Sequence, residues 1–451
     1  MSKESTSLNP KPGLNKTPLI LTAALILILG LAAGGYLLLR DSEPPLIAIT
    51  PDAAEVGRAA RLGVEVSDAG SGLKRLVIVA LQDGREIPLA DRSYSPPAGS
   101  AREDIDLQAV DIAEGTFTLR VTAQDASLAL FGQKGLSSLE RTYTLDATPP
   151  VVTIKSPVNN LNRGGSGFMV YALSEPARET GIRVGERFFP AHLQPTAGPG
   201  LVYYCLYAMP WDTTLDQFKP VIAAEDAAGN RIEIPFYYHA NPRDFRRDTI
   251  VLSDSFMERT LPEFQGLLPD GGTPLERYLY VNSTLRQQSR ATLAELSRQT
   301  EPTMLWDSAF LRLPNAANRA GFADARDYLY QGRKVDFQTH LGLDLASVKN
   351  APVPAGNDGR VVYADFLGIY GNLVVIDHGL GLQSLYAHLS EMDVKPGDRV
   401  VKGQIIGKTG TSGLAGGDHL HFGITVAGLP VQPIEWWDAT WIQNNVTSKL
   451  P

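Results

Sequence analysis

Histidine is concentrated in one stretch of this chain, between His340 and Phe422. Five of the seven histidines in the 451-residue sequence fall inside it. The stretch opens with His340-Leu-Gly-Leu-Asp344, contains Tyr386-Ala-His388-Leu389 and closes with His419-Leu-His421-Phe422. Imidazole and carboxylate groups are donors that zinc accepts, and imidazole also transfers protons near neutral pH. The stretch therefore predicts a metal site that carries its own acid and base groups.

The spacing of these motifs indicates how the groups would be presented. His419 and His421 are two residues apart, so in a strand both side chains leave the same face while their neighbours point into a core. One of these imidazoles can then bind a metal while the other faces a substrate. His340 and Asp344 add a nitrogen and a carboxylate that lie close together in the sequence. Three protein ligands leave a fourth zinc position for water, which is typical of catalytic sites.

The three motifs resemble the signatures of lysostaphin-type, LytM-domain zinc endopeptidases of metallopeptidase family 23. The Gly-Asn-Leu-Val-Val-Ile-Asp-His-Gly run at 371–379 and the segments at 394–400, 402–407 and 410–413 match as well. The resemblance covers about residues 335–435. It implies one zinc ion per chain, bound by His340, Asp344 and His421.

The resemblance also implies roles outside the ligand set. It makes His388 and His419 the catalytic imidazoles, without dividing the general-base and oxyanion roles between them. It implies that the substrate is the peptide part of bacterial peptidoglycan. We assign no chemistry to His378, which is expected in a hairpin turn. Two positions depart from the family pattern, Gly423 where many members have glutamate, and Asp418 before the His-x-His pair, and neither is a ligand position.

Two other functions are considered. Some LytM-domain proteins lack zinc and regulate other cell-wall hydrolases without cleaving anything themselves. The ligand set of this chain is complete, which favours the enzyme over such a regulator. A surface adhesin would leave the zinc motifs unexplained. The sequence does not identify the bond cleaved, the type of envelope, the oligomeric state or protein partners in cell-wall or division complexes. It also leaves open whether the upstream helical segment at 273–299 restrains the site.

Composition limits the remaining possibilities. The formal net charge of −8 provides no surplus of cations to neutralise phosphates, so nucleic acid is not an expected partner. Cys205 is the single cysteine, so no disulfide can form within the chain. It lies in the apolar run Leu201–Tyr207, which predicts a buried and unreactive thiol.

The N-terminal region has the pattern of a membrane anchor. Residues 1–17 are polar and contain three lysines, and Pro18–Leu39 carries no charge. As a helix this run would measure about 33 Å, enough to cross the hydrocarbon core of a bilayer. The positive-inside rule places residues 1–17 in the cytoplasm as a tail. We therefore expect a single-pass protein of the bacterial cytoplasmic membrane with its catalytic domain outside the cytoplasm.

Residues 44–240 contain an internal repeat. Pro44–Ile49 is echoed by Pro149–Ile154, and Ala123–Ala126 is echoed by Ala224–Ala227. Apolar and polar residues alternate between turn residues, which is typical of antiparallel strands in a β-sandwich. The segment resembles immunoglobulin-like domains of bacterial surface proteins, with units at 44–148 and 149–240. We expect these units to act as a spacer, and we interpret their two histidines, His192 and His239, as surface or packing residues.

The rest of the chain changes from helix to strand. Residues 241–324 are expected to connect the domains through helices at 254–265 and 273–299, the second capped by Thr273. Residues 322–337 should form the first strand or hairpin of a compact antiparallel β domain at 325–440. The predicted fold class is therefore mainly β, with an anchor helix, two sandwiches, a short helical region and a LytM-type peptidase domain. A fragment starting near residue 241 is expected to fold by itself.

Overall fold

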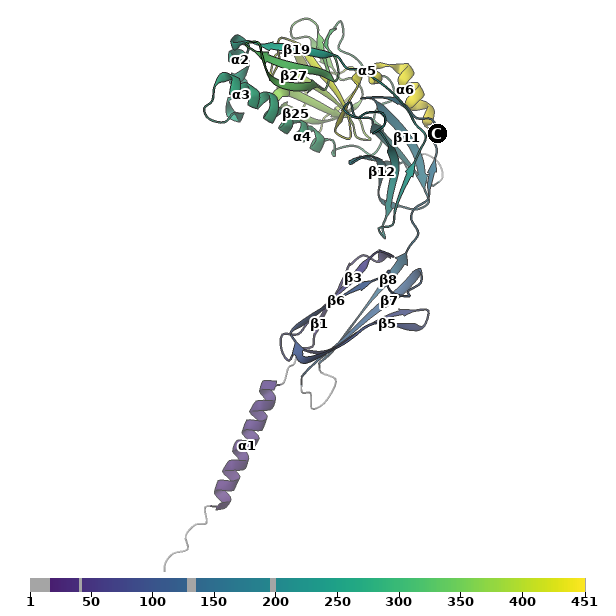
Figure 1. Cartoon of the computed structure of the whole chain (residues 1–451), viewed down its shortest axis with the longest axis vertical. Helices are drawn as coiled ribbons and strands as arrows, with labels where there is room; N and C mark the ends of the chain where they lie inside the picture. The colour runs from purple at the N-terminus through teal and green to yellow at the C-terminus, as the bar shows by residue number, and fades with distance from the viewer. Residues whose placement is uncertain (1–16, 40–42, 128–134, 195–199, 451) are drawn as a thin grey trace, which may run out of the picture. The chain divides into compact units, whose positions relative to one another are not determined.

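Strands dominate the chain, which confirms the mainly β class predicted from the sequence. The structure, a computed structural model, describes residues 17–39, 43–127, 135–194 and 200–450. The chain divides into two compact units (Figure 1). One consists of Met1–Thr148 with Ala228–Asn230, and the other of Pro149–Ala227 with Arg231–Pro451.

Helix α1, Thr17–Leu39, coincides with the predicted anchor segment (Figure 1). Its side chains are described for residues 21–36, where leucines and isoleucines such as Leu25 and Ile26 are exposed. Within the part of the chain that the structure describes, we find no helix with the length and apolar character needed to cross a membrane. The predicted cytoplasmic tail lies outside the described residues up to residue 16. The anchor and its orientation stay predictions.

In the first unit, two sheets pack against a shared apolar core. Alternating side chains such as Val64, Ile78 and Phe117 fill this core. The three-stranded sheet has the order β1 (Leu46–Thr50), β3 (Arg61–Ser67), β6 (Ser100–Asp106). The five-stranded sheet has the order β2 (Glu55–Gly57), β8 (Leu136–Asp146), β7 (Gly115–Asp125), β4 (Leu73–Gln82), β5 (Arg85–Ala98). The immunoglobulin-like assignment of residues 44–148 stays a prediction.

The second unit begins with two four-stranded sheets and a parallel strand pair. The first sheet is β14 (His192–Leu193), β15 (Leu201–Ala208), β11 (Ser166–Leu173), β9 (Val152–Ile154). The second is β13 (Arg187–Pro190), β12 (Ala177–Val184), β16 (Pro220–Asp226), β17 (Arg231–Pro235). The pair is β10 (Asn160–Asn162) and β18 (His239–Asn241). Here too the immunoglobulin-like assignment stays a prediction.

The core of these sheets continues into the C-terminal region of the same unit. Phe168 and Tyr207 belong to one apolar cluster with Trp306, Phe310 and Trp436. Polar contacts cross the same boundary, since the Gln432 N–H donates to the Gly164 carbonyl at 2.8 Å. Apart from Ala228–Asn230, residues 149–240 therefore belong to the unit that holds the C-terminal domain, which differs from the separate spacer predicted from the sequence.

Within the second unit, helices lie between the strands of residues 149–240 and the C-terminal sheet in the sequence. The predicted helix at 254–265 is α2 (Asp254–Thr260) followed by the 3₁₀ helix η1 (Leu261–Leu267). The change occurs between Thr260 and Leu261, just before Pro262, which has no N–H to continue the α-helical ladder. The predicted helix at 273–299 is α3 (Pro274–Tyr280), the π segment η2 (Val281–Leu285) and α4 (Arg286–Leu296). Thr273 caps α3 in a capping box with Glu276, which confirms the predicted cap.

These helices lie beside the C-terminal sheet (Figure 1). Leu285 and Leu293 pack in one cluster with Leu373, Val375 and Leu385 from that sheet. A separate three-stranded sheet joins β19 (Arg247–Leu252) to the hairpin of β21 (Asp324–Tyr330) and β22 (Arg333–His340). This hairpin confirms the one predicted at 322–337, and β22 ends at the first motif histidine.

The C-terminal sheet has ten strands. Its main path is β20 (Ala317–Ala320), β23 (Leu343–Ala346), β30 (Leu420–Val426), β27 (Leu382–Met392), β26 (Asn372–Asp377), β25 (Gly359–Phe366), β28 (Arg399–Val400). β24 (Pro352–Pro354), β29 (Ile405–Thr409) and β31 (Leu429–Val431) pair off this path. The short helices are η3 (Gly368–Tyr370), α5 (Pro433–Trp437), α6 (Ala439–Asn445) and η4 (Thr447–Lys449). Because β23, β30 and β27 are neighbours, Asp344 and the other two motifs meet in this sheet, and His340 reaches them from the end of β22 in the separate three-stranded sheet.

Candidate metal and catalytic centre

Strand register brings the motif residues together. Asp344 on β23 lies opposite His421 on β30. On the other side of β30, Ala387 of β27 lies opposite the same histidine, so His388 follows directly. Leu420 and Phe422 are buried on the opposite face while His419 and His421 line a pocket, as the period-two pattern predicts.

Three donor atoms converge on one point. The Nε2 of His340, the Nδ1 of His421 and the Oδ1 of Asp344 lie 3.0 Å from one another in all three pairings. Ligands of a tetrahedral zinc ion are separated by about 3.3 Å, given Zn–N and Zn–O bonds of about 2.0–2.1 Å. Two imidazole nitrogens and a carboxylate oxygen at nearly this spacing fit zinc in both donor type and geometry.

Backbone atoms lie close to both candidate imidazole ligands, His340 and His421. The Nδ1 of His340 lies 2.8 Å from the Gly321 carbonyl, to which it donates, so Nε2 keeps its lone pair for a metal. The backbone at Gly342 passes close to the other imidazole. A Cβ at this position would stand 2.5 Å from the His421 Nε2 and 2.8 Å from the Phe422 carbonyl oxygen. Glycine is therefore required here for the first motif to reach the third.

The electrostatics favour deprotonated ligands. Burial alone would raise the pKa of Asp344, but the charge of His340 and hydrogen bonds from the three surrounding imidazoles hold it well below its usual value. Burial is the main reason that the pKa of His421 falls to about 4. At neutral pH both residues thus offer free lone pairs, which metal binding requires.

His388 is held in an unusual conformation. Its φ of 62° is in the left-handed region, which non-glycine residues seldom adopt and which often marks functional sites. The Nδ1 donates to the Ser412 carbonyl at 2.8 Å, so Nε2 is the atom with a free lone pair. Ser412 is itself fixed by hydrogen bonds to Asn372 and Leu389. Burial, followed by the nearby His419 and His421, lowers the pKa of His388 well below its usual value.

His419 completes the group. Its ring centroid lies 4.7 Å from that of His388. Its Nδ1 donates to the Gly417 carbonyl at 2.7 Å, and its Nε2 lies 3.6 Å from the Asp344 carboxylate. Burial alone would lower the pKa of His419, but its hydrogen bond and attraction to Asp344 outweigh burial and raise it. The structure therefore gathers all five predicted site residues, three as a donor cluster and two as imidazoles beside it.

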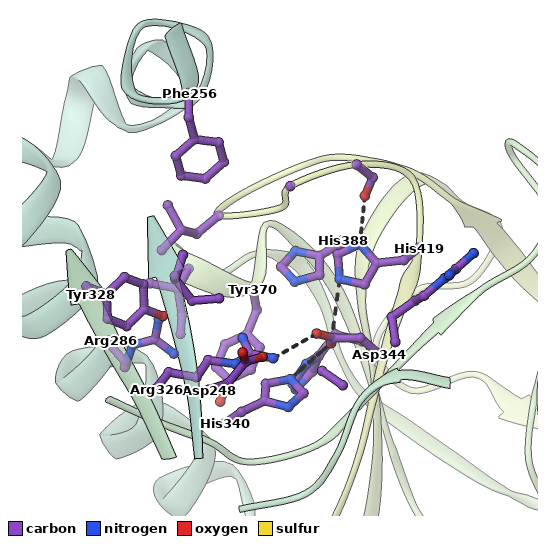
Figure 2. Close-up of a pocket in the computed structure, with 18 of the residues that line it drawn as sticks. Asp248, Phe256, Arg286, Arg326, Tyr328, His340, Asp344, Tyr370, His388 and His419 are labelled. Carbon is purple, nitrogen blue, oxygen red and sulfur yellow. Dashed lines mark hydrogen bonds and ion pairs between the residues drawn. The ribbon is translucent and has the colours of Figure 1, made fainter. Parts of the chain in front are cut away.

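The centre lies at one side of a cavity of about 710 Å³ (Figure 2). Sequence reasoning did not identify several residues that line it, including Arg326, Tyr328 and Tyr370. Arg326 donates through Nη2 to the Oδ2 of Asp344 at 3.2 Å. Arg286 lines the cavity from α4, which belongs to the helical segment whose effect on the site the sequence left open. Local pattern could place Arg286 only on the polar side of its helix, because strand pairing and helix packing are what bring these side chains to the cavity.

The remaining singled-out residues have structural roles. His378 is fully buried. Its Nδ1 lies 2.6 Å from the Asp358 carbonyl oxygen, and its Nε2 lies 2.7 Å from the Ser384 hydroxyl. Asp418 accepts hydrogen bonds from the Thr409 hydroxyl and the Asn350 N–H, so it fixes a loop.

The residues singled out in the 149–240 repeat lie away from this centre. His239 is exposed and His192 half-buried, both on short strands. Cys205 is fully buried, and burial raises the pKa of its thiol, as the unreactive assignment predicts.

Comparison with known proteins identifies the C-terminal domain. Residues 338–433 match the family model of Peptidase family M23. The DD-carboxypeptidase/endopeptidase Mpg of Neisseria meningitidis is 39% identical over 98 residues, which are 22% of this chain and 23% of Mpg. The peptidoglycan DD-endopeptidase ShyA of Vibrio cholerae is 41% identical over 96 residues, 21% of this chain and 22% of ShyA. The match thus spans about a quarter of the length of these relatives.

A solved structure is also similar. The catalytic domain of lysostaphin from Staphylococcus simulans has 28% identity, with 29% of this chain and 98% of that domain covered and a TM-score of 0.25. Together the family match and the named relatives confirm an M23, LytM-type domain at the C-terminus and support a peptidase.

Proposed function

We propose that this protein is a zinc-dependent endopeptidase that hydrolyses peptide cross-links or stems of bacterial peptidoglycan. The convergence of three donor atoms at 3.0 Å, with two further imidazoles beside them, carries the proposal. The alternative, a regulator without activity, would not need this complete set of groups. Relatives that match the same domain are named as DD-endopeptidases, which supports a cell-wall peptide as substrate.

The residues divide into two groups. His340, Asp344 and His421 would hold the zinc ion, which when bound supplies Lewis acidity and lowers the pKa of a water molecule towards about 7. His388 and His419 both present Nε2 at the cavity, because each donates its Nδ1–H to a backbone carbonyl. Each can therefore take a proton at Nε2 or, once protonated, donate one to the substrate.

Product analysis tests this function. Purified protein is incubated with isolated peptidoglycan, and the soluble fragments are analysed by mass spectrometry. We expect new peptide amine and carboxylate ends, and none with the His421→Ala variant. A protein that binds one equivalent of zinc and releases no fragments from wall or from soluble cross-linked peptides would favour the regulator.

We also propose that Pro18–Leu39 anchors the protein in the cytoplasmic membrane with the C-terminal domain outside the cytoplasm. The support is the uncharged sequence of this segment, its helical conformation and its exposed leucine and isoleucine side chains. Protease added to spheroplasts should digest the chain beyond residue 40. Complete protection of the C-terminal domain in intact spheroplasts would contradict this topology.

A further inference from the structure

The cavity beside the donor cluster is rich in arginine. Five arginines line it, and three aspartates. The arginines are Arg259, Arg286, Arg290, Arg319 and Arg326. Each aspartate already has a partner. Asp248 pairs with Arg246, and Asp344 interacts with the imidazoles and with Arg326. Asp418 accepts hydrogen bonds from a hydroxyl and a backbone N–H. The lining of the cavity therefore carries excess positive charge.

Two of these arginines stand one turn apart on the same helix. Arg286 and Arg290 both belong to α4 and both line the cavity. Arg286 donates to the backbone and side-chain oxygens of Asn282, and Arg290 donates to the Thr339 carbonyl at 2.8 Å. Among the residues described, no carboxylate forms an ion pair with either of them. Like charges at this spacing destabilise a helix unless another group compensates.

Partial burial makes the two neighbouring positive charges of Arg286 and Arg290 less favourable for the stability of the fold. Both side chains are half-buried, and the Nε of Arg290 is buried with no hydrogen-bond partner among the described residues. Burial lowers the pKa of Arg290 and the neighbouring Arg286 charge lowers it further, while interaction with Tyr370 offsets only part of this decrease. Arg298, beyond the end of the same helix, behaves differently. It is exposed and pairs with Glu295 at 2.9 Å, as a surface arginine normally does.

We infer that Arg286 and Arg290 form a carboxylate-binding subsite, and that the substrate carries a free carboxylate near its scissile bond. Guanidinium groups bind carboxylates through charge-assisted and often bidentate hydrogen bonds. Figure 2 shows Arg286 and Tyr328 on one side of the cavity, with Arg326 between them and Asp344. The inference rests on the proposed function and specifies its substrate as a cell-wall peptide with a free carboxylate.

Paired substrates test the subsite. A cross-linked peptide dimer is prepared with its carboxylates free and with the same carboxylates amidated, and the full chain is assayed on both. Wild type should cleave the free form roughly 10- to 100-fold better in kcat/KM, the range expected for hydrogen bonds to a charged group. Arg286→Gln should lose most of this preference through a higher KM, with zinc content unchanged. Arg286→Lys should retain part of it.

Controls separate the possible results. Arg298→Gln changes an exposed arginine that does not line the cavity and should keep the full preference. Arg290→Gln should act like Arg286→Gln. Arg290 bonds to Thr339, the residue before His340, so the Arg290→Gln variant can fail to fold. In that case Arg286→Gln alone tests the subsite, because the hydrogen bonds of Arg286 stay within its own helical segment. Equal cleavage of both substrates by wild type, or a preference that survives Arg286→Gln, overturns the subsite. Failure of wild type to cleave either form overturns the proposed endopeptidase, and the subsite with it.

Discussion

Individual side chains in the candidate centre have different partners, and these differences are the basis for proposing metal binding for some of them and proton transfer for others. The proposed donor atoms of His340, Asp344 and His421 face one another at 3.0 Å. His388 instead bonds to the backbone through Nδ1 and lies beside the cluster. Substitutions in the two groups should therefore have distinguishable effects.

We expect His421→Ala and Asp344→Ala to lose bound zinc and activity together, with lower thermal stability because the metal binds only the folded state. His388→Ala and His419→Ala should keep near-stoichiometric zinc while turnover falls roughly 10²–10⁴-fold. Zinc content by atomic emission and cleavage of soluble cross-linked peptides measure the two effects. The exposed His239→Ala is the matched control and should change neither. Loss of metal from His388→Ala would show that the roles are assigned wrongly.

Burial of His378 predicts a pH dependence of stability. Burial lowers its pKa from 6.5 to about 4, so between these values the unfolded chain binds more protons than the folded one. The neutral, buried His378 therefore contributes about 3 kcal/mol to the free energy of unfolding above pH 6.5. This contribution is lost as the pH falls towards 4. Urea unfolding between pH 7.5 and 4.5 should show a smaller pH slope for His378→Gln than for wild type. Equal slopes would mean that His378 does not titrate in this way.

At the scale of elements, α5 fastens the strands of residues 149–240 to the C-terminal domain. Glu435 on α5 is buried and accepts hydrogen bonds from the Asn162 side chain at 2.8 Å and the Ser166 N–H at 2.9 Å. Burial raises the pKa of its carboxyl, so these two donors compensate an otherwise unfavourable position.

Removing this carboxyl should destabilise the whole second unit. Glu435→Ala leaves one buried donor, the Ser166 N–H, and one partly buried donor, the Asn162 amide, without this acceptor, so we expect a loss of about 2–4 kcal/mol in the free energy of unfolding. Glu391→Ala, which removes an exposed ion pair with Lys408, should cost less than about 1 kcal/mol. Chemical denaturation of both variants measures the difference. Similar losses would mean that the Glu435 contacts do not join the two regions.

For the molecule as a whole, the shared core determines where the chain can be divided. Phe322 packs edge-on against Trp211 and Phe245, and the preceding residue, Gly321, accepts the hydrogen bond that orients His340. Residues 149–240 thus support the loop that positions a predicted metal ligand.

We therefore expect residues 149–451 to fold as a soluble, zinc-binding and active fragment. A fragment of residues 241–451 should aggregate or lose at least tenfold in zinc affinity, because its apolar face is uncovered and the 321–323 loop is unsupported. Solubility, circular dichroism and zinc titration compare the two. Full activity of the shorter fragment would instead support the prediction that residues 149–240 are a separate spacer.

The sequence by itself determined the mainly β class and the helices at 254–265 and 273–299, and it singled out the five residues that the structure gathers in the candidate centre. These follow from local periodicity, a local cap and three short motifs. Tertiary structure alone decided what surrounds them. The pairing of β23 with β30 and the position of His340 at the end of β22 set the donor distances, and packing of α4 against the sheet brings Arg286 into the cavity. The continuity of the core across residue 241 depends on contacts between residues more than a hundred positions apart, such as Phe168 and Trp436, which no local pattern encodes.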